Sequence, residues 1–314
     1  MYTHFYRLTE KPFDVTSNPR FLYLPPSHRE ALASLVYGIQ ERRGVLVLVG
    51  EVGTGKTTLL RAAMEQLEET TRFAFIFYTN TDFSEQLKMV AEELKISSPA
   101  MRVSEAKLFN RLKEFAEFQA KKGQNVAILV DEAQNLDYKT LENYRLLSNI
   151  ESRAGKLVQI VFSGQPELEK KLNDHRLRQL AQRINLRRYL APLDEKETLE
   201  YVNHRLKIAG GEGLFSDACL ELVWKYSGGI PRKINMICDN ALLIGYGLEK
   251  RKITPEIIQE VHSDLTWSPF PNDTKDDETQ NDDSQAEGDS SSDGSKTPVF
   301  KTGTKANEAV FLKN

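Results

Sequence analysis

Residues 50–58 read GEVGTGKTT, and this stretch decides how the rest of the sequence is interpreted. It fits the pattern G-x-x-x-x-G-K-[ST], whose glycines let successive backbone N–H groups curl around a phosphate. The apolar run at residues 45–49 precedes it, and the helical pattern TTLLRAAMEQLEE follows it, with its positive end aimed at the same anion. We therefore expect a phosphate-binding loop made of Gly50, Glu51, Val52, Gly53, Thr54, Gly55, Lys56, Thr57 and Thr58.

A second motif, VAILVDEAQ at residues 126–134, is an apolar strand that ends in Asp131 and Glu132. Both carboxylates would lie at the carboxyl edge of the sheet, where phosphates bind. We expect Lys56 to neutralise charge between the β- and γ-phosphates of ATP, and Thr57 and Asp131 to hold Mg²⁺. Glu132 suits polarising the attacking water. We expect this strand to lie beside the strand at 45–49 that carries the phosphate loop.

A third motif, VQIVFSGQPEL at residues 158–168, is another apolar strand that ends in polar residues. Ser163 or Gln165 would reach the γ-phosphate or the attacking water. The spacing does not choose between these two residues. The alternative is a strand that simply turns into a loop at a polar pair.

The remaining pattern predicts an α/β domain with a parallel sheet, followed by a small all-helical domain. Apolar, β-branched runs alternate with helical patterns, as in βαβ units. Expected strands cover residues 45–49, 73–79, 126–130, 157–162 and 187–190, and Ser27 and Glu30 have the spacing of a capping box. After Pro192 only helical patterns remain; they begin near Asp194, Ser216, Pro231 and Thr254. The expected domains are residues 1–192, 193–266 and a tail at 267–314.

The composition is that of an ordinary soluble protein, with 314 residues, 40% apolar side chains, 28% charged side chains and a net charge of −3. Residues 271–314 hold ten acidic and five basic side chains, and 273–293 contain a single apolar residue, so we expect a disordered acidic tail. The two cysteines have no metal-ligand spacing, and no apolar run is long enough for a secretory signal or a membrane span. These features exclude secreted, membrane-spanning and disulfide-scaffold proteins and favour the cytoplasm.

Taken together, the motifs resemble the AAA+ ATPases of the general secretion pathway protein A (ExeA-like) family. GEVGTGKTT, ILVDEAQNL, SGQPEL, LAQRI and GGIPRKIN occur in the order typical of that family, and residues 4–32 resemble its beginning. The resemblance covers roughly residues 3–265. It implies a P-loop ATPase core, a helical lid domain, and ATP bound between subunits of a homo-oligomer.

The resemblance also assigns roles to single residues. Ser163 or Gln165 falls at the first sensor, and Arg232 at the second. Arg183 matches the arginine offered to a neighbouring subunit, with Arg178 close enough to be a rival. A guanidinium suits these roles because its planar fork stays charged and grips phosphate oxygens. The alternatives are a solvated basic face for Arg183 and a surface arginine at a helix start for Arg232.

The family pattern changes at the C-terminus, where members named for secretion continue into a membrane span and a peptidoglycan-binding domain. Here the acidic stretch stands in that place, so we do not expect cell-wall binding or direct membrane attachment. The leading hypothesis is an ATPase that assembles or remodels a partner complex for secretion or exopolysaccharide export, in the cytoplasm or at the inner membrane through a partner. The alternatives are a DNA-binding ATPase of the transposition type, supported only by the arginines between Arg176 and Arg188, and a nucleotide-gated interaction protein with little turnover.

Overall fold

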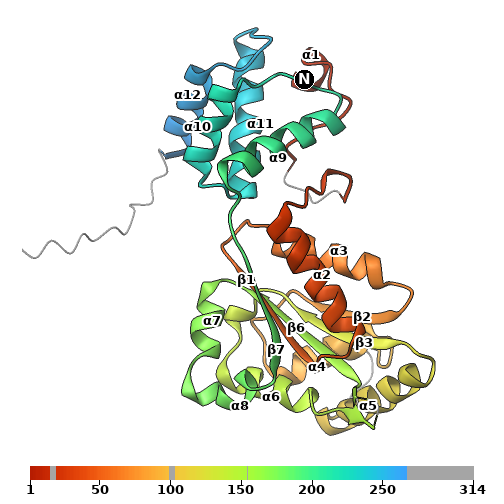
Figure 1. The fold of residues 1–314 in the computed structure, drawn as a ribbon. Helices are drawn as coiled ribbons and strands as arrows, with labels where there is room; N and C mark the ends of the chain where they lie inside the picture. Colours follow the sequence, from red (N-terminus) through yellow and green to blue (C-terminus); the bar gives the residue numbers. More distant parts are fainter. Residues whose placement is uncertain (15–18, 99–102, 154, 267–314) are drawn as a thin grey trace, which may run out of the picture. The chain divides into compact units, whose positions relative to one another are not determined.

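The computed structural model describes residues 1–14, 19–98, 103–153 and 155–266 (Figure 1). The acidic tail expected at 267–314 lies outside the described residues. Residues Met1–Ser268 form one compact unit. None of the helices among the described residues combines the length and hydrophobicity that crossing a bilayer requires.

Five parallel strands form the central sheet, in the order β2-β3-β6-β1-β7. Their bounds are β1 (Val45–Gly50), β2 (Thr71–Ile76), β3 (Asn125–Val130), β6 (Val158–Gly164) and β7 (Ile184–Leu190). The expected parallel α/β fold is therefore confirmed. The expectation that β3 lies beside β1 is wrong, because β6 pairs with both and separates them. The motif that ends in Ser163 is thus the direct neighbour of the phosphate-loop strand.

Helices cover both faces of this sheet, which explains why β1, β3 and β6 are buried along their whole length. Alternate side chains of β1 point to opposite faces. Val45, Val47 and Val49 pack in one buried cluster, and Leu46 and Leu48 pack in another. The first cluster contains residues of α4 (Phe83–Glu93), α5 (Glu105–Lys121), α6 (Tyr138–Leu147), α7 (Pro166–Leu172) and α8 (Arg178–Ala181). The second contains residues of α2 (Pro26–Gln40) and α3 (Lys56–Leu67).

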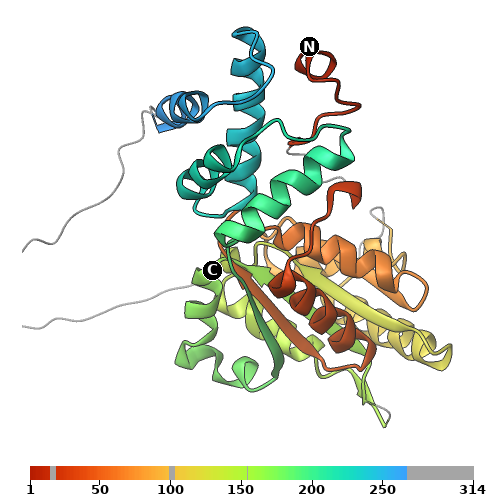
Figure 2. The ribbon, with the colours of Figure 1, turned by 45° about the horizontal axis from the view of Figure 1, so that its top comes forward.

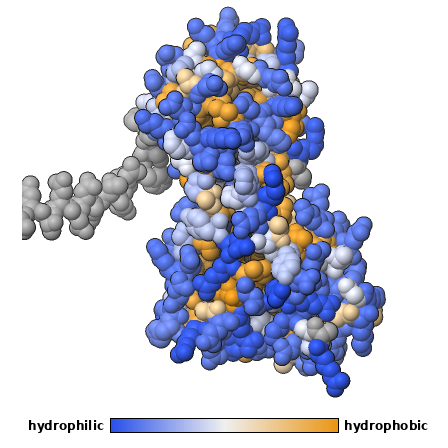
Figure 3. Space-filling view, viewed as in Figure 1, coloured by the Kyte–Doolittle hydropathy of each residue, from blue (hydrophilic) through white to orange (hydrophobic). Residues whose placement is uncertain are grey.

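The strand expected at 187–190 is longer than its sequence pattern indicates. β7 is the last strand of the sheet, where it pairs with β1. Its residues alternate between exposed and less exposed, so its sequence mixes polar with apolar side chains. Hydrophobic residues are visible at the surface in this part of the molecule (Figure 3). A cavity of about 130 Å³ there is lined partly by Val47, Val49, Leu172 and Tyr189.

Two local features differ from the sequence pattern. The expected capping box is wrong, because α2 begins at Pro26 after Pro25 and no side chain caps it. The Ser27 hydroxyl lies instead 3.2 Å from Nδ1 of His28. A small antiparallel hairpin, β4 (Glu151–Ser152) and β5 (Gly155–Lys156), was not expected and projects at the bottom of Figure 2.

The helical region after Pro192 contains α9 (Glu195–Ile208), α10 (Asp217–Ser227), α11 (Pro231–Gly247) and α12 (Pro255–Thr266), close to the expected positions. Their ends follow from local chemistry. Asp194 and Glu197 form a capping box at the start of α9, and the Ser216 hydroxyl accepts a hydrogen bond at the start of α10. Gly228, in the left-handed conformation, ends α10.

The first residues of the chain pack with these C-terminal helices. Tyr2 and Tyr6, from and just after α1 (Tyr2–Phe5), are buried in the same cluster as α9–α12, and so is Phe21 of the 3₁₀ helix η1 (Pro19–Phe21). The Thr9 backbone N–H donates to the carbonyl of Ala209 at 2.8 Å. Both views show α1 beside α11 (Figures 1 and 2). The division of the chain at residue 192 stays a prediction. The helices α9–α12 contain a core to which the chain's first residues contribute.

Candidate nucleotide site

The phosphate loop connects the end of β1 directly to the start of α3. Gly53 and Gly55 have positive φ angles of 85° and 98°, a conformation that side-chain-bearing residues rarely adopt. The Thr54 hydroxyl donates to the carbonyl of Glu51 at 2.8 Å and closes the turn. A Cβ atom on Gly53 would also lie 2.7 Å from Cβ of Arg232, because the start of α11 packs against the loop at this point.

Lys56 is the first residue of α3, and its ammonium folds back over the loop. Its Nζ donates to the carbonyls of Gly50 at 2.9 Å and Glu51 at 3.0 Å. Burial lowers the pKa of Lys56, while the carboxylates of Glu132, Asp131 and Glu51 partly oppose this shift. A buried ammonium held by these two carbonyl oxygens is well placed to exchange them for phosphate oxygens.

Thr57 and Asp131, expected to hold Mg²⁺, lie together although 74 positions separate them. The Thr57 hydroxyl donates to Oδ2 of Asp131 at 2.5 Å. One hydroxyl and one carboxylate suit Mg²⁺, which keeps several of its waters in protein sites. In the described part of the chain, no group of three or more His, Cys, Asp or Glu side chains could hold a metal by itself.

Glu132 follows β3 with a φ of 51°, a left-handed conformation that is unusual for a residue with a side chain. Its backbone carbonyl accepts a hydrogen bond from the Thr79 hydroxyl at 3.2 Å. Its Oε2 accepts from Nε2 of Gln134 at 2.6 Å and from Nε2 of Gln165 at 3.3 Å. The carboxylate is therefore held by two neutral amides.

The two candidate sensor residues have different surroundings. Gln165 contacts Glu132, whereas the Ser163 hydroxyl is fully buried and has no hydrogen-bond partner among the described residues. Ser163 pairs in register with Leu48 of β1, so it lies beside the strand that delivers the phosphate loop. The structure thus brings Gln165, but not Ser163, into contact with the other predicted site residues.

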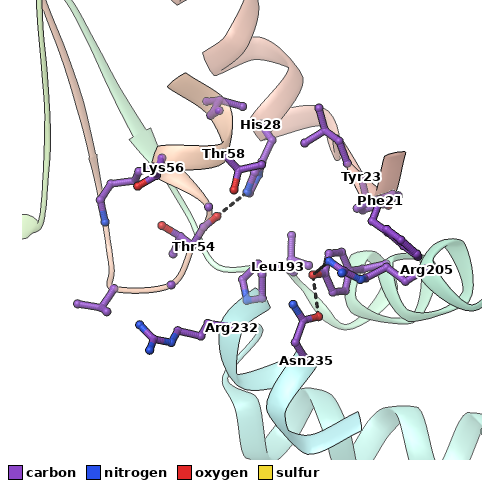
Figure 4. A pocket seen from close by; sticks show the side chains of 18 of the residues that line it. Phe21, Tyr23, His28, Thr54, Lys56, Thr58, Leu193, Arg205, Arg232 and Asn235 are labelled. Carbon is purple, nitrogen blue, oxygen red and sulfur yellow. Dashed lines mark hydrogen bonds between the residues drawn. The ribbon is translucent and has the colours of Figure 1, made fainter. Parts of the chain in front are cut away.

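A cavity of about 390 Å³ lies over the phosphate loop, between α3 and the helices that follow Pro192 (Figure 4). Its lining includes residues 52–58, Glu132 and Arg232, all expected at the site. The exposed Arg232 side chain faces the loop, and its backbone N–H donates to the carbonyl of Gly53 at 3.2 Å. Gly50, Glu51 and Asp131 are not among the lining residues, but each accepts a hydrogen bond from one of them.

Sequence reasoning missed the residues at the other end of the cavity. Tyr201 donates to Oδ1 of Asn235 at 2.9 Å and accepts from the buried guanidinium of Arg205 at 2.9 Å. Arg205 also donates to the carbonyl of Pro12 at 2.5 Å, which ties the chain's first residues to α9. Phe21 lies under the same guanidinium. Asn235 ends the motif GGIPRKIN, which assigned it no role, and no motif marks Tyr201 or Arg205.

His28 was also missed, although it supports the phosphate loop directly. Its Nε2 lies 3.1 Å from the carbonyl of Thr54 (Figure 4). A signal was available in the sequence. His28 falls on the same helical face as Ala31, Leu32 and Leu35, which are buried against the sheet.

The two candidate trans arginines do not line the cavity. Arg183 lies directly before β7, at the amino edge of the sheet and away from the phosphate loop of its own chain. Arg178 is exposed at the start of α8. Others in this arginine cluster are engaged within the chain: Arg176 pairs with Asp174 at 2.7 Å, and Arg188 donates to Ser34 at 2.8 Å.

Comparison with known proteins identifies the family. A family model described as an AAA domain matches residues 39–172. Over 272 residues the chain is 39% identical to general secretion pathway protein A of Aeromonas hydrophila, a match that covers 86% of this chain and 48% of that protein. The chain is an AAA+ P-loop NTPase and a homologue of general secretion pathway protein A. It spans about half the length of this curated relative.

Solved structures show the same AAA+ fold at low sequence identity. Drosophila ORC bound to DNA superposes with a TM-score of 0.65 and 21% identity, covering 85% of this chain and 66% of that one. Cdc6p from Pyrobaculum aerophilum gives 0.62 and 20%, covering 80% and 71%. ORC2 of Aeropyrum pernix, described in ADPNP–ADP complexes, gives 0.59 and 17%, covering 81% and 71%.

Proposed function

We propose that this AAA+ protein binds and hydrolyses MgATP. The observation that carries the proposal is the hydrogen bond between Thr57 and Asp131, with Glu132 lining the cavity that also contains Lys56. The phosphate loop supplies backbone N–H groups and the positive end of α3. The same cavity extends far enough from the loop to reach Tyr23 and Asn235, which leaves room for a base and ribose.

In this mechanism each residue has a separate task. Lys56 neutralises phosphate charge after leaving the carbonyls of Gly50 and Glu51. Thr57 and Asp131 hold Mg²⁺, which screens the charge of the phosphates. Glu132 orients the attacking water and accepts its proton. Gln165, in contact with Glu132, is better placed than Ser163 to report on the γ-phosphate.

We further propose that the protein works as a homo-oligomer, with Arg232 reading the nucleotide within the chain and Arg183 serving the next subunit. The proposed work is assembly or remodelling of a protein complex for secretion or envelope export, as the name of the Aeromonas relative suggests. The DNA-binding alternative has less support. Two arginines of the 176–188 cluster form ion pairs within the chain, Arg176 with Asp174 and Arg188 with Glu30, which reduces the charge available for phosphates.

Two variants separate binding from hydrolysis. Glu132→Gln keeps the shape of the side chain but loses the proton acceptor, so ATP affinity should persist while turnover falls by about 100-fold or more. Lys56→Ala removes a charge-assisted contact and should weaken binding itself by about 10- to 100-fold. Titration with a fluorescent ATP analogue and a phosphate-release assay measure the two effects, with Lys170→Ala on α7 as the exposed-lysine control. Equal turnover in wild type and Glu132→Gln would contradict the proposal.

A further inference from the structure

Gln134 makes two side-chain hydrogen bonds to which neither the motifs nor the mechanism above assign a task. It lies in the 3₁₀ helix η2 (Ala133–Asn135), two positions after Glu132. Its Nε2 donates to Oε2 of Glu132 at 2.6 Å, and its Oε1 accepts from the backbone N–H of Gln165 at 3.1 Å. One amide thus connects the Glu132 carboxylate to the turn that follows β6.

The chemistry of the two partners fixes the orientation of this amide. A backbone N–H can only donate, and an ionised carboxylate can only accept. The Gln134 oxygen must therefore face Gln165 and its nitrogen must face Glu132. The opposite orientation would place two donors together at one end and two acceptors together at the other, so the amide has a single stable setting.

Neighbouring residues hold this arrangement in place. Lys171 of α7 donates to the backbone carbonyls of Gln134 at 2.6 Å and Leu136 at 2.7 Å, which anchors η2. A Cβ atom on Gly164 would lie 2.8 Å from Oε1 of Gln134. Glycine at position 164 therefore leaves the space through which the Gln134 side chain reaches Gln165.

We propose that Gln134 is a positioning residue that acts through Glu132, and that it couples the position of the turn, formed by the end of β6 and Gln165, to that of the carboxylate. The inference rests on the proposed ATP hydrolysis. Gly164 pairs in register with Val49, so the turn lies beside the start of the phosphate loop. A γ-phosphate that attracts the Gln165 side chain shifts the turn, and the Gln134 amide passes this shift to Glu132.

Two substitutions separate the two ends of the bridge. Gln134→Met keeps the length of the side chain and removes both hydrogen bonds. Gln134→Glu keeps an acceptor for the Gln165 N–H but faces Glu132 with another carboxylate oxygen. Both should lower kcat by about 10- to 100-fold, since small misplacements of a reacting group cost this much. KM and the affinity for a fluorescent ATP analogue should change less than about twofold, because Gln134 bonds the Glu132 carboxylate and the Gln165 backbone N–H, and the proposal gives neither group a contact that holds the nucleotide.

Hydrogen exchange of the Gln165 amide, measured without nucleotide, tests the bridge independently of hydrolysis. Exchange should become about fivefold faster in Gln134→Met, which leaves the N–H without its acceptor, and stay slow in Gln134→Glu. Asn135→Ala, the exposed neighbour in the same turn, is the matched control and should leave exchange and turnover unchanged. Equal exchange in wild type and Gln134→Met would overturn the bridge.

A double-mutant cycle decides whether Gln134 acts through Glu132. Glu132→Asp shortens the side chain by one methylene and so moves the carboxylate away from Gln134. In that background, Gln134→Met should lower kcat by at most about a further twofold. If the reductions in kcat caused by the two single substitutions multiply in the double variant, the task proposed for Gln134 is overturned, while the proposed ATP hydrolysis still stands. Wild-type turnover no higher than that of Lys56→Ala would instead refute the proposed function, and with it the task given to Gln134 in hydrolysis.

Discussion

The His28 ring joins the helix before the sheet to the phosphate loop through one nitrogen only. Its Nε2 lies 3.1 Å from the carbonyl of Thr54, which can only accept, so this nitrogen carries the proton. Its Nδ1 then accepts from the Ser27 hydroxyl in the neutral ring. Burial lowers the pKa of His28, while the bond to Thr54 and the charge of Glu197 partly oppose the shift.

This lowered pKa predicts a pH dependence of stability. Below about pH 6.5, His28 binds a proton in the unfolded chain more readily than in the folded chain. The free energy of unfolding therefore falls as the pH falls. Above about pH 6.5 the contribution is fully present. His28→Gln keeps a donor near Thr54 without titrating, so it should lose less stability than wild type between about pH 7.5 and 5.5. Urea unfolding at both pH values measures this.

Ser27→Ala is the matched control for that experiment, because it removes the partner of Nδ1 but keeps the titrating ring. It should retain the wild-type loss of stability on acidification. If His28→Gln and wild type lost the same amount, the lowered pKa of His28 would not contribute to stability.

The residues of the proposed nucleotide site could be located from the sequence because the proposed ligand sets their spacing along the chain. Lys56 and Thr57 stand at fixed positions in one loop, and Asp131 and Glu132 end an apolar strand. Gln134 and Arg205 could not be found in this way. Their tasks depend on the backbone N–H of Gln165, which every residue type except proline would supply, and on the backbone carbonyl of Pro12, which any residue type would supply.

At the scale of elements, a buried polar chain connects α6, α4 and the loop after β2. The Tyr144 hydroxyl donates to Oε1 of Gln86 at 2.8 Å, and the Gln86 amide donates to the carbonyl of Thr81 at 2.9 Å. Tyr144 and Gln86 are both fully buried. Thr79, in the same loop, supports the backbone of Glu132. These hydrogen bonds therefore fix the loop after β2, which contacts the site.

Removing one hydroxyl tests what these buried hydrogen bonds contribute to stability. Tyr144→Phe leaves the Gln86 oxygen buried without a partner and should destabilise the fold by about 1–3 kcal/mol. Tyr138→Phe, on the same helix, removes a partly exposed hydrogen bond to Asp174 and should cost less than about 1 kcal/mol. Chemical denaturation of both variants measures the difference. Equal costs would mean that the buried chain contributes no more than a surface contact.

Element positions followed from the sequence where burial is complete and failed where it is partial. The strands β1, β3 and β6 are buried along their whole length, so apolar runs marked them. At the sheet edge, β7 begins three residues before its expected start because its exposed side chains are polar. The order of strands could not be derived, since β3 and β6 have equally apolar sequences and nothing local decides which one pairs with β1.

At the scale of the whole molecule, the position of Arg183 at the amino edge of the sheet predicts a site completed by two chains. Arg183→Ala should leave the affinity for ATP mostly intact and lower kcat by about 10³- to 10⁵-fold, as expected for an arginine supplied in trans. Subunits with Arg183→Ala, mixed with subunits carrying Glu132→Gln, should recover part of the activity. Some mixed interfaces then contain both native groups.

Arg178→Ala is the matched control for the mixing experiment, because this arginine is exposed in the preceding helix. It should keep most of the wild-type turnover. Proven co-assembly without recovery of activity would contradict a trans role for Arg183 and favour either Arg178 or a site completed within one chain.

The packing of the first residues with the C-terminal helices has a consequence for protein synthesis. Tyr2 donates to Asp239, a partner 237 positions later in the chain. A ribosome adds about 5–20 residues per second, so roughly 12–47 s pass before that partner exists. During this interval the side chains of Tyr2, Tyr6 and Phe13 have no C-terminal helix to pack against. The α/β region, which lies in sequence between these residues and the C-terminal helices, is made before those helices. A nascent chain halted before residue 195 should therefore offer these aromatic residues to chaperones and proteases, and their protection should begin only when α9–α12 have left the ribosome.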